Sequence, residues 1–168
     1  MSWPPHITVA TVVFRQSVAR PSVARQSVAR PPVAREHEFL LVEEQDNNTR
    51  VFNQPAGHLE PNETLLDAAI RETLEETGWR VSLIGLVGVY QYYSAHNDTT
   101  YLRFCFAATP EQQEQTDLDP DITAAHWLSW DQIVSLPHRS PLVMTCMEDF
   151  ATGKLVPLDR IQSLIPVS

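Results

Sequence analysis

The hydrophobic pattern divides the chain into short apolar runs separated by polar or proline-rich segments. Runs rich in β-branched and aromatic residues predict strands over residues 6–14, 39–44, 51–54, 81–92, 101–109 and 124–128. Helices are predicted over residues 63–77, 130–136 and 140–152. Strands on both sides of one central helix, followed by further helices, predict a single domain of the α+β class.

The predicted helix over residues 63–77 has an apolar and an acidic face. Asn62 is expected to be its N-cap, and Gly78 is expected to end it at the C′ position. The apolar stripe should face the core and consists of Leu66, Ala69, Ile70, Thr73, Leu74 and Thr77. Glu72, Glu75 and Glu76 fall on the other side, so we expect their carboxylates to converge. Mutual repulsion at this spacing becomes binding when a hard cation such as Mg²⁺ is present.

Three further residues make this helix more than an acidic surface. Arg71 precedes Glu75 by four residues and can pair with it or with Glu63, which would orient the carboxylates. Gly57 ends a predicted strand that runs into a turn, where a missing side chain allows close backbone approach to a ligand. Its carbonyl oxygen could then join a metal shell. A solvated acidic face is the alternative, but it leaves these three residues unexplained.

Composition and charge narrow the class of protein. The 168 residues, 43% of them hydrophobic, suffice for one domain with a core. A net charge of −9 disfavours binding to a nucleic-acid polymer or a membrane surface. The chain has no apolar run long enough to span a membrane and starts without a secretory-signal pattern. Cys105 and Cys146 lie in apolar patterns, so we expect buried free thiols rather than a disulfide, and a cytoplasmic protein.

An unusual repeat separates the first two predicted strands. Residues 16–35 contain four pentads ending in Val-Ala-Arg, and a period of five matches neither a helix nor a strand. Pro21, Pro31 and Pro32 disfavour both structures as well. We expect a flexible insertion at a hairpin tip. The alternative is a basic tether for an acidic partner or a polyphosphate, because residues 15–36 carry a charge of +4.

The segment from Gly57 to Gly78 reads Gly-x5-Glu-x7-Arg-Glu-x2-Glu-Glu-x-Gly and resembles the Nudix box. The chain is similar to Nudix hydrolases over residues 6–158, with residues 16–35 as an insertion and 159–168 as a C-terminal tail. The resemblance implies an α/β/α sandwich with a mixed sheet and a central catalytic helix. A bacterial subgroup that removes phosphate from nucleoside tri- and diphosphates, hydroxymethylpyrimidine diphosphate and thiamine diphosphate is resembled by residues 6–10, 39–44, 53–60, 102–104 and 139–143.

The same resemblance implies roles for the residues of the box. Mg²⁺, with Mn²⁺ as a substitute, would be bound by Gly57, Glu72, Glu75 and Glu76. Glu63 and Arg71 would orient these ligands. The general base would be Glu72 or Glu75. Asp119 and Asp121, in a loop, are alternative bases, although ordinary turn chemistry competes with that role.

Substrate contacts are expected from residues outside the box. Tyr92, Tyr93, Arg103 and His58 could stack on a pyrimidine or contact phosphate, with packing or surface roles as the alternative. His96 is expected to be solvated. Arg139 and Ser140 open a predicted helix whose N-terminus could receive an anion, or Ser140 could be a plain N-cap.

The partner would be a small-molecule substrate, and we expect a monomer, with a dimer as the alternative. Two rival functions remain open. One is a Nudix pyrophosphohydrolase acting on damaged nucleotides or ADP-ribose. The other is a non-catalytic domain that senses a nucleotide.

Overall fold

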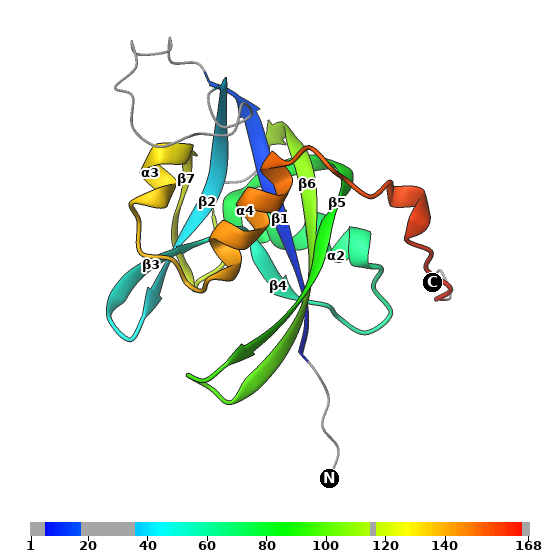
Figure 1. The fold of residues 1–168 in the computed structure, drawn as a ribbon, viewed down its shortest axis with the longest axis horizontal. Coiled ribbons are helices and arrows are strands. Elements are labelled where there is room, and N and C mark those ends of the chain that lie inside the picture. Colours follow the sequence, from blue (N-terminus) through cyan, green and yellow to red (C-terminus); the bar gives the residue numbers. More distant parts are fainter. Residues whose placement is uncertain (1–5, 18–35, 115–116, 166–168) are drawn as a thin grey trace.

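The computed structural model describes residues 6–17, 36–114 and 117–165 (Figure 1). Its strands are β1 (His6–Gln16), β2 (His37–Asp46), β3 (Thr49–Asn53), β4 (Ala56–His58), β5 (Trp79–Ser94), β6 (Thr99–Gln113) and β7 (Ile122–Ser129). Its helices are α2 (Leu65–Thr77), α3 (Trp130–Val134), α4 (Leu142–Ala151) and the short 3-10 helix η1 (Leu158–Arg160). In this part of the chain, no helix is long and apolar enough to cross a membrane.

The strands form one mixed sheet with the order β3-β2-β1-β6-β5. β1 runs parallel to β6, and the other pairings are antiparallel. The second edge of β1 is divided between two partners. Its first half, around Thr8 to Ala10, pairs with β4, and its last half, from Val13 to Gln16, pairs with β2. β2 and β4 therefore diverge from one another along β1.

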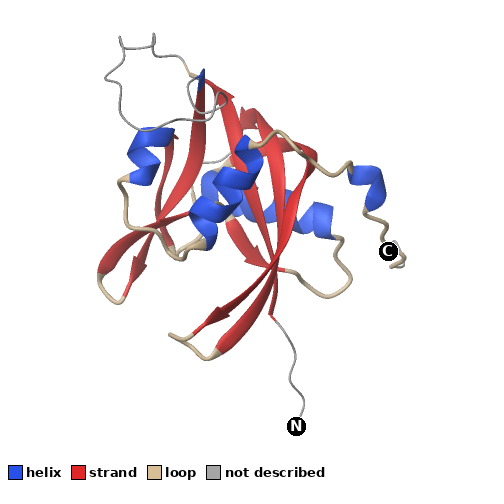
Figure 2. Cartoon of the chain, in the orientation of Figure 1, coloured by secondary structure: helices blue, strands red, loops and turns tan. Residues whose placement is uncertain are grey.

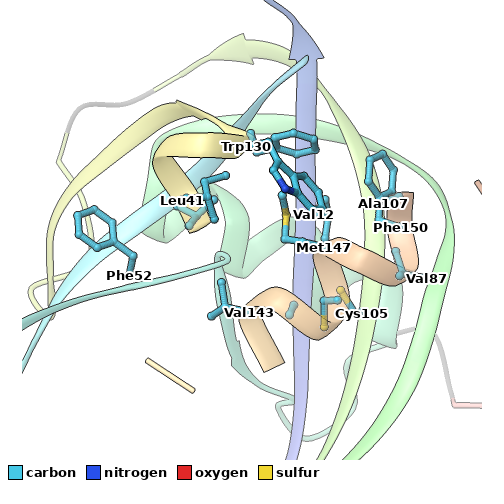
Figure 3. Packing of buried hydrophobic residues seen from close by; sticks show 14 residues of the cluster. Val12, Leu41, Phe52, Val87, Cys105, Ala107, Trp130, Val143, Met147 and Phe150 are labelled. Atoms are coloured by element: carbon cyan, nitrogen blue, oxygen red, sulfur yellow. The ribbon is translucent and has the colours of Figure 1, made fainter. Parts of the chain in front are cut away.

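Helices cover both faces of the sheet (Figures 1 and 2). On one face, α3 and α4 enclose the largest core cluster, in which Val12, Leu41 and Phe150 are buried (Figure 3). On the other face, Ala68 and Ala69 of α2 pack against Val9. Because both faces are covered, the central strands are continuously apolar rather than alternating. The predicted α+β class and α/β/α sandwich are confirmed.

Helix α2 ends as predicted but begins differently. Gly78 adopts the left-handed conformation (φ 74°), and its N–H donates to the Leu74 carbonyl at 2.8 Å. The N-cap is Thr64, whose hydroxyl accepts from the Asp67 N–H at 3.0 Å, so the assignment of Asn62 was wrong. Asn62 instead adopts a positive φ in the preceding turn.

The buried face of α2 carries small residues: Ala68, Ala69, Thr73 and Thr77. The larger members of the predicted stripe, Leu66, Ile70 and Leu74, are half-buried. Small side chains allow α2 to lie close to the sheet, and the two threonine hydroxyls are satisfied by carbonyls one turn earlier in the helix.

Other boundaries differ from the sequence predictions by a few residues. β6 continues to Gln113 instead of ending near residue 109, because its last residues pair with Trp79 and Arg80 at the start of β5. Beyond residue 158, Ile161 packs against the core cluster under α2. Cys105 and Cys146 are buried and free, as predicted.

Most of the pentad segment, residues 18–35, lies outside the described residues. Where β1 ends and β2 begins, the Ser17 N–H donates to the Glu36 carbonyl at 2.8 Å. Gln16 and His37 are paired next to them. The two ends of the segment are thus held side by side as in a hairpin.

Candidate active site

Gly57 of β4 lies directly against the carboxylate of Glu72 on α2. A Cβ atom at Gly57 would be 2.1 Å from the Glu72 carboxyl carbon, a distance that real Cβ atoms essentially never show. The absence of a side chain therefore gives Glu72 its place between helix and strand. The backbone φ of Gly57 is ordinary, so this glycine is required by space rather than by conformation.

Arg71 is the centre of an ion-pair network on the same helix. Its guanidinium donates twice to Glu63, at 2.7 and 2.9 Å. It also donates to Glu72 at 2.8 Å, to Glu75 at 3.0 Å and to the His58 carbonyl at 3.1 Å. Hydrogen bonds from Arg71 lower the pKa of Glu63. One arginine thus pairs with both of its predicted partners and with Glu72, and ties α2 to β4.

Glu76 has a different environment from the other glutamates of the box. Its carboxylate accepts the Ala56 N–H at 2.8 Å. Burial, together with the nearby charges of Glu44, Glu72 and Asp119, raises the pKa of Glu76 to about 9. Burial is also the main cause that raises the pKa of Glu72. Burial thus disfavours the charged form of both groups, and a bound cation would compensate this effect.

The predicted convergence is seen for two of the three carboxylates, since Glu72 and Glu75 accept from the same Nη1 atom of Arg71. Glu72 and Glu75 turn to Arg71, whereas Glu76 turns to the Ala56 amide. Across the described ranges, no three acidic, histidine or cysteine side chains gather closely enough to hold a metal ion. Arg71 holds Glu72 and Glu75 together, and Glu76 is held apart from them by a backbone amide.

The chemistry of these residues nevertheless fits a hard divalent cation. Carboxylate and carbonyl oxygens are the ligands that Mg²⁺ prefers. Glu72 and Glu76 are the two box carboxylates whose pKa is raised by burial, so that their negative charge is costly without a cation. A bound cation would relieve that cost, and the carbonyl of Gly57, a residue that lies against the Glu72 carboxylate, would be a further oxygen ligand.

A pocket of about 410 Å³ opens beside Gly57 and Glu76. The ends of β2 and β3 and the segment before α4 also line it. There Arg139 pairs with Asp46 at 2.8 Å and with Glu44 at 3.5 Å. Glu44 also accepts from the Asn53 side chain at 3.3 Å. The pocket is therefore lined both by the box carboxylate of Glu76 and by Glu44 and Asp46, whose charges Arg139 partly neutralises.

Most side chains predicted to contact substrate do line this pocket: His58, Tyr92, Arg103, Arg139 and Ser140. Asp121, one of the two loop residues considered as a general base, lines it as well. His96, predicted to be solvated, is exposed at its rim. Tyr93 instead points to the surface of the β5–β6 hairpin, where its hydroxyl donates to Asp98. The Asp119 carboxylate accepts from the Asp121 N–H at 2.9 Å, which is the turn chemistry weighed against a catalytic role.

Sequence reasoning missed Thr8, Glu44, Asp46 and Asn53 as pocket residues. A signal was available for Asn53 and Glu44, because a buried strand rarely ends in polar residues without a partner. Thr8 and Asp46 carried no comparable signal, since a threonine in a strand and an aspartate at a turn are ordinary.

Comparisons with known proteins agree with this arrangement. The NUDIX domain model matches residues 24–144. The chain is 37% identical over 159 residues to Phosphatase NudJ of Escherichia coli (strain K12), which covers 94% of this chain and 90% of that protein. The chain belongs to the NUDIX family.

Solved structures show the same fold. A NUDIX hydrolase from Nitrosomonas europaea is 38% identical, with a TM-score of 0.79, and the match covers 95% of this chain and 97% of the other. The NUDIX domain of Shewanella oneidensis NrtR, solved with ADP ribose, has a TM-score of 0.69 at 14% identity, covering 89% and 88%. This second likeness is one of fold alone. Together the findings identify a NUDIX hydrolase with a NudJ-like sequence.

Proposed function

We propose that this NUDIX hydrolase is a Mg²⁺-dependent phosphatase that cleaves phosphoanhydride bonds. Its substrates would be nucleoside tri- and diphosphates, hydroxymethylpyrimidine diphosphate and thiamine diphosphate, each losing orthophosphate. The observation that carries the proposal is the position of Glu76 and Gly57, which place the box at the wall of a pocket large enough for a small phosphorylated molecule. The extended similarity to a protein named Phosphatase NudJ supports the phosphatase activity over other reactions of the family.

The residues of the box would divide the work of the reaction. Glu72, Glu75, Glu76 and the Gly57 carbonyl would hold Mg²⁺, which neutralises phosphate charge and polarises the bond to be cleaved. Arg71 and Glu63 would keep the carboxylates oriented, as their hydrogen bonds indicate. Glu72 or Glu75 would accept the proton of the attacking water. Glu75 is the more accessible of the two, with 47% of its side chain exposed against 14% for Glu72.

Two other functions remain candidates within the same fold. A pyrophosphohydrolase acting on damaged nucleotides or ADP-ribose would share the chemistry and differ in the pocket. A domain that only senses a nucleotide would bind without turnover. The complete set of box acids favours catalysis over sensing.

A substrate panel with Mg²⁺ tests the proposal. Nucleoside tri- and diphosphates, thiamine diphosphate, hydroxymethylpyrimidine diphosphate and ADP-ribose would be incubated with the protein and their products separated. Stepwise orthophosphate release supports the proposal. Pyrophosphate from triphosphates, or AMP from ADP-ribose, would assign the alternative specificity, and binding without any product would assign a sensor.

Variants of the box link the activity to this site. We expect Glu75→Gln and Glu76→Gln each to lower kcat by about 10²-fold or more, since each removes a metal contact. Glu114→Gln, an exposed glutamate paired with Arg80, is the matched control and should retain activity. Full turnover by the box variants in limiting Mg²⁺ would overturn the assignment.

We further propose that the enzyme is cytoplasmic, in keeping with its two buried free thiols, and monomeric.

A further inference from the structure

Arg103 is a buried cation in the pocket that forms no ion pair with any residue the structure describes. It lies in β6 between β1 and β5, lines the pocket, and is 9% exposed. Its Nε and Nη1 atoms are buried and have no hydrogen-bond partner among the described residues. A guanidinium buried in this way is costly unless it is paired. The unpartnered N–H groups therefore indicate a binding partner that comes from outside the chain.

The acids that line the pocket do not supply this partner. Glu44 is the pocket acid whose pKa the charge of Arg103 affects. Arg103 lowers this pKa, but burial has the larger effect and the pKa of Glu44 is raised in total. The Glu44 carboxylate already accepts from Asn53 and pairs with Arg139. Asp46 pairs with Arg139 as well. Arg139 is thus committed to protein carboxylates, whereas Arg103 is not.

Two hydroxyl groups and a helix end share the pocket with Arg103. The hydroxyls of Thr8 and Ser140 are buried and also lack partners within the described part of the chain. Thr8 is paired with Arg103 across β1 and β6. Ser140 precedes α4, whose N-cap position, Pro141, provides no side-chain cap. The positive end of α4 therefore begins at the lining of the pocket without a side-chain acceptor, although the Val143 N–H donates to the Ser140 carbonyl at 3.2 Å.

We propose that Arg103, Ser140 and Thr8, with the N-terminus of α4, form a seat for a phosphate group of the substrate. This is a phosphate other than the one held at Gly57 and Glu76. That the phosphate belongs to a substrate rests on the proposed function. The seat itself rests on the unpartnered groups alone.

The seat and the box lie at a distance that one polyphosphate substrate can bridge. Thr8 is paired with Arg103 on one side and with His58, the neighbour of Gly57, on the other. Two strand spacings separate Arg103 from His58, which is about 10 Å between backbones. Long side chains pointing into the pocket shorten this gap. Arg103 is thus a binding residue that sets how phosphates are aligned with the box.

A phosphate fits the seat better than the edge of a base. A guanidinium forms two parallel charge-assisted hydrogen bonds with phosphate oxygens, and hydroxyl groups and helix amides donate to the same anion. A neutral base would leave the charge of Arg103 uncompensated.

The test measures binding without turnover and without metal. Inorganic phosphate, pyrophosphate and an uncharged nucleoside would be titrated by calorimetry into the full-length protein in excess chelator. We expect phosphate and pyrophosphate to bind. The affinity for the nucleoside should be independent of Arg103. Arg103→Met should weaken phosphate binding by about 10- to 100-fold, as expected for loss of a charge-assisted pair. Ser140→Ala should weaken it several-fold, and Arg80→Met, at an exposed arginine, should not change it.

Kinetics provide a second measurement. Arg103→Met should raise KM at least tenfold with a much smaller change in kcat, because the seat aligns substrate rather than reacting with it. If Arg103→Met does not fold, Arg103→Lys keeps the charge and loses the planar fork, and it should bind phosphate with reduced affinity. Equal phosphate binding by wild type and the folded variant, or no phosphate binding by wild type, would overturn the proposal. A nucleoside affinity that depends on Arg103 while phosphate affinity does not would replace it with base recognition.

Failure of the proposed function would be visible separately. Glu75→Gln, which lies outside the seat, should bind phosphate in chelator as the wild type does. A protein that binds phosphate through Arg103 but releases no orthophosphate from any compound of the panel would retain the seat and lose the assigned activity.

Discussion

Substitution of Gly57 by alanine tests whether the contact between strand and helix positions the box. The added Cβ would lie 2.1 Å from the Glu72 carboxyl carbon, whereas contacts under 3.0 Å do not occur. The carboxylate must therefore move by roughly 1 Å, a displacement that can cost about 10²-fold in rate when it affects a catalytic group. This corresponds to about 2.7 kcal/mol of transition-state stabilisation. We expect Gly57→Ala to fold and to lose activity by this factor.

The assay is orthophosphate release at saturating Mg²⁺, with circular dichroism to confirm folding. Gly153→Ala is the matched control, because its Cβ would meet nothing within 4 Å. Its left-handed backbone (φ 72°) should cost stability by about 1 kcal/mol but leave kcat intact. A folded Gly57→Ala protein with kcat within threefold of wild type would show that the close contact between Gly57 and Glu72 does not matter to the reaction.

Three further predictions address the network, the pH dependence and the insertion. Arg71→Lys should lower kcat at least tenfold and Tm by a few degrees, because an ammonium cannot bind three carboxylates in the planar geometry of a guanidinium. Kinetics and thermal denaturation measure the two effects, and unchanged values of kcat and Tm would contradict the role of the network. In chelator, the free energy of unfolding should fall as pH rises from about 5 toward 9, by at most about 1.4 kcal/mol per pH unit from Glu76. The reason is that its raised pKa makes the folded state hold a proton that the unfolded chain releases. Denaturation of Glu76→Gln should show a flatter dependence, and identical slopes would refute this cause. Replacing residues 18–35 by Asn-Gly should preserve fold and turnover, since Ser17 and Glu36 are already hydrogen-bonded; a large loss of activity would assign those residues a role.

Local patterns explain why the helix of the box was predictable. Spacing along a helix determines which residues share a face, and Gly78 ends the helix through its own conformational preference. The same logic located Arg71 beside Glu63 and Glu75. It could not rank Thr64 above Asn62 as the N-cap, because both side chains suit that position and the preceding turn decides between them.

The pocket was less predictable, because its walls come from residues far apart in the sequence. Glu44, Asn53 and Arg139 meet through strand pairings that no local pattern contains. The three helix carboxylates were expected to converge, but only Glu72 and Glu75 meet at Arg71, whereas Glu76 accepts from the Ala56 amide. Whether Arg103 was packed, exposed or available to a ligand depended on which face of β6 it occupied.

The divided edge of β1 has a consequence for how this chain could change. The opening between β2 and β4 comes from the course of the backbone, since β1 hydrogen-bonds to one strand and then to the other. Replacing side chains around the opening would alter which molecule fits while the backbone pairings that create it stay the same. New substrate preferences can therefore arise by mutation of the rim while the acidic helix and its glycine stay as they are.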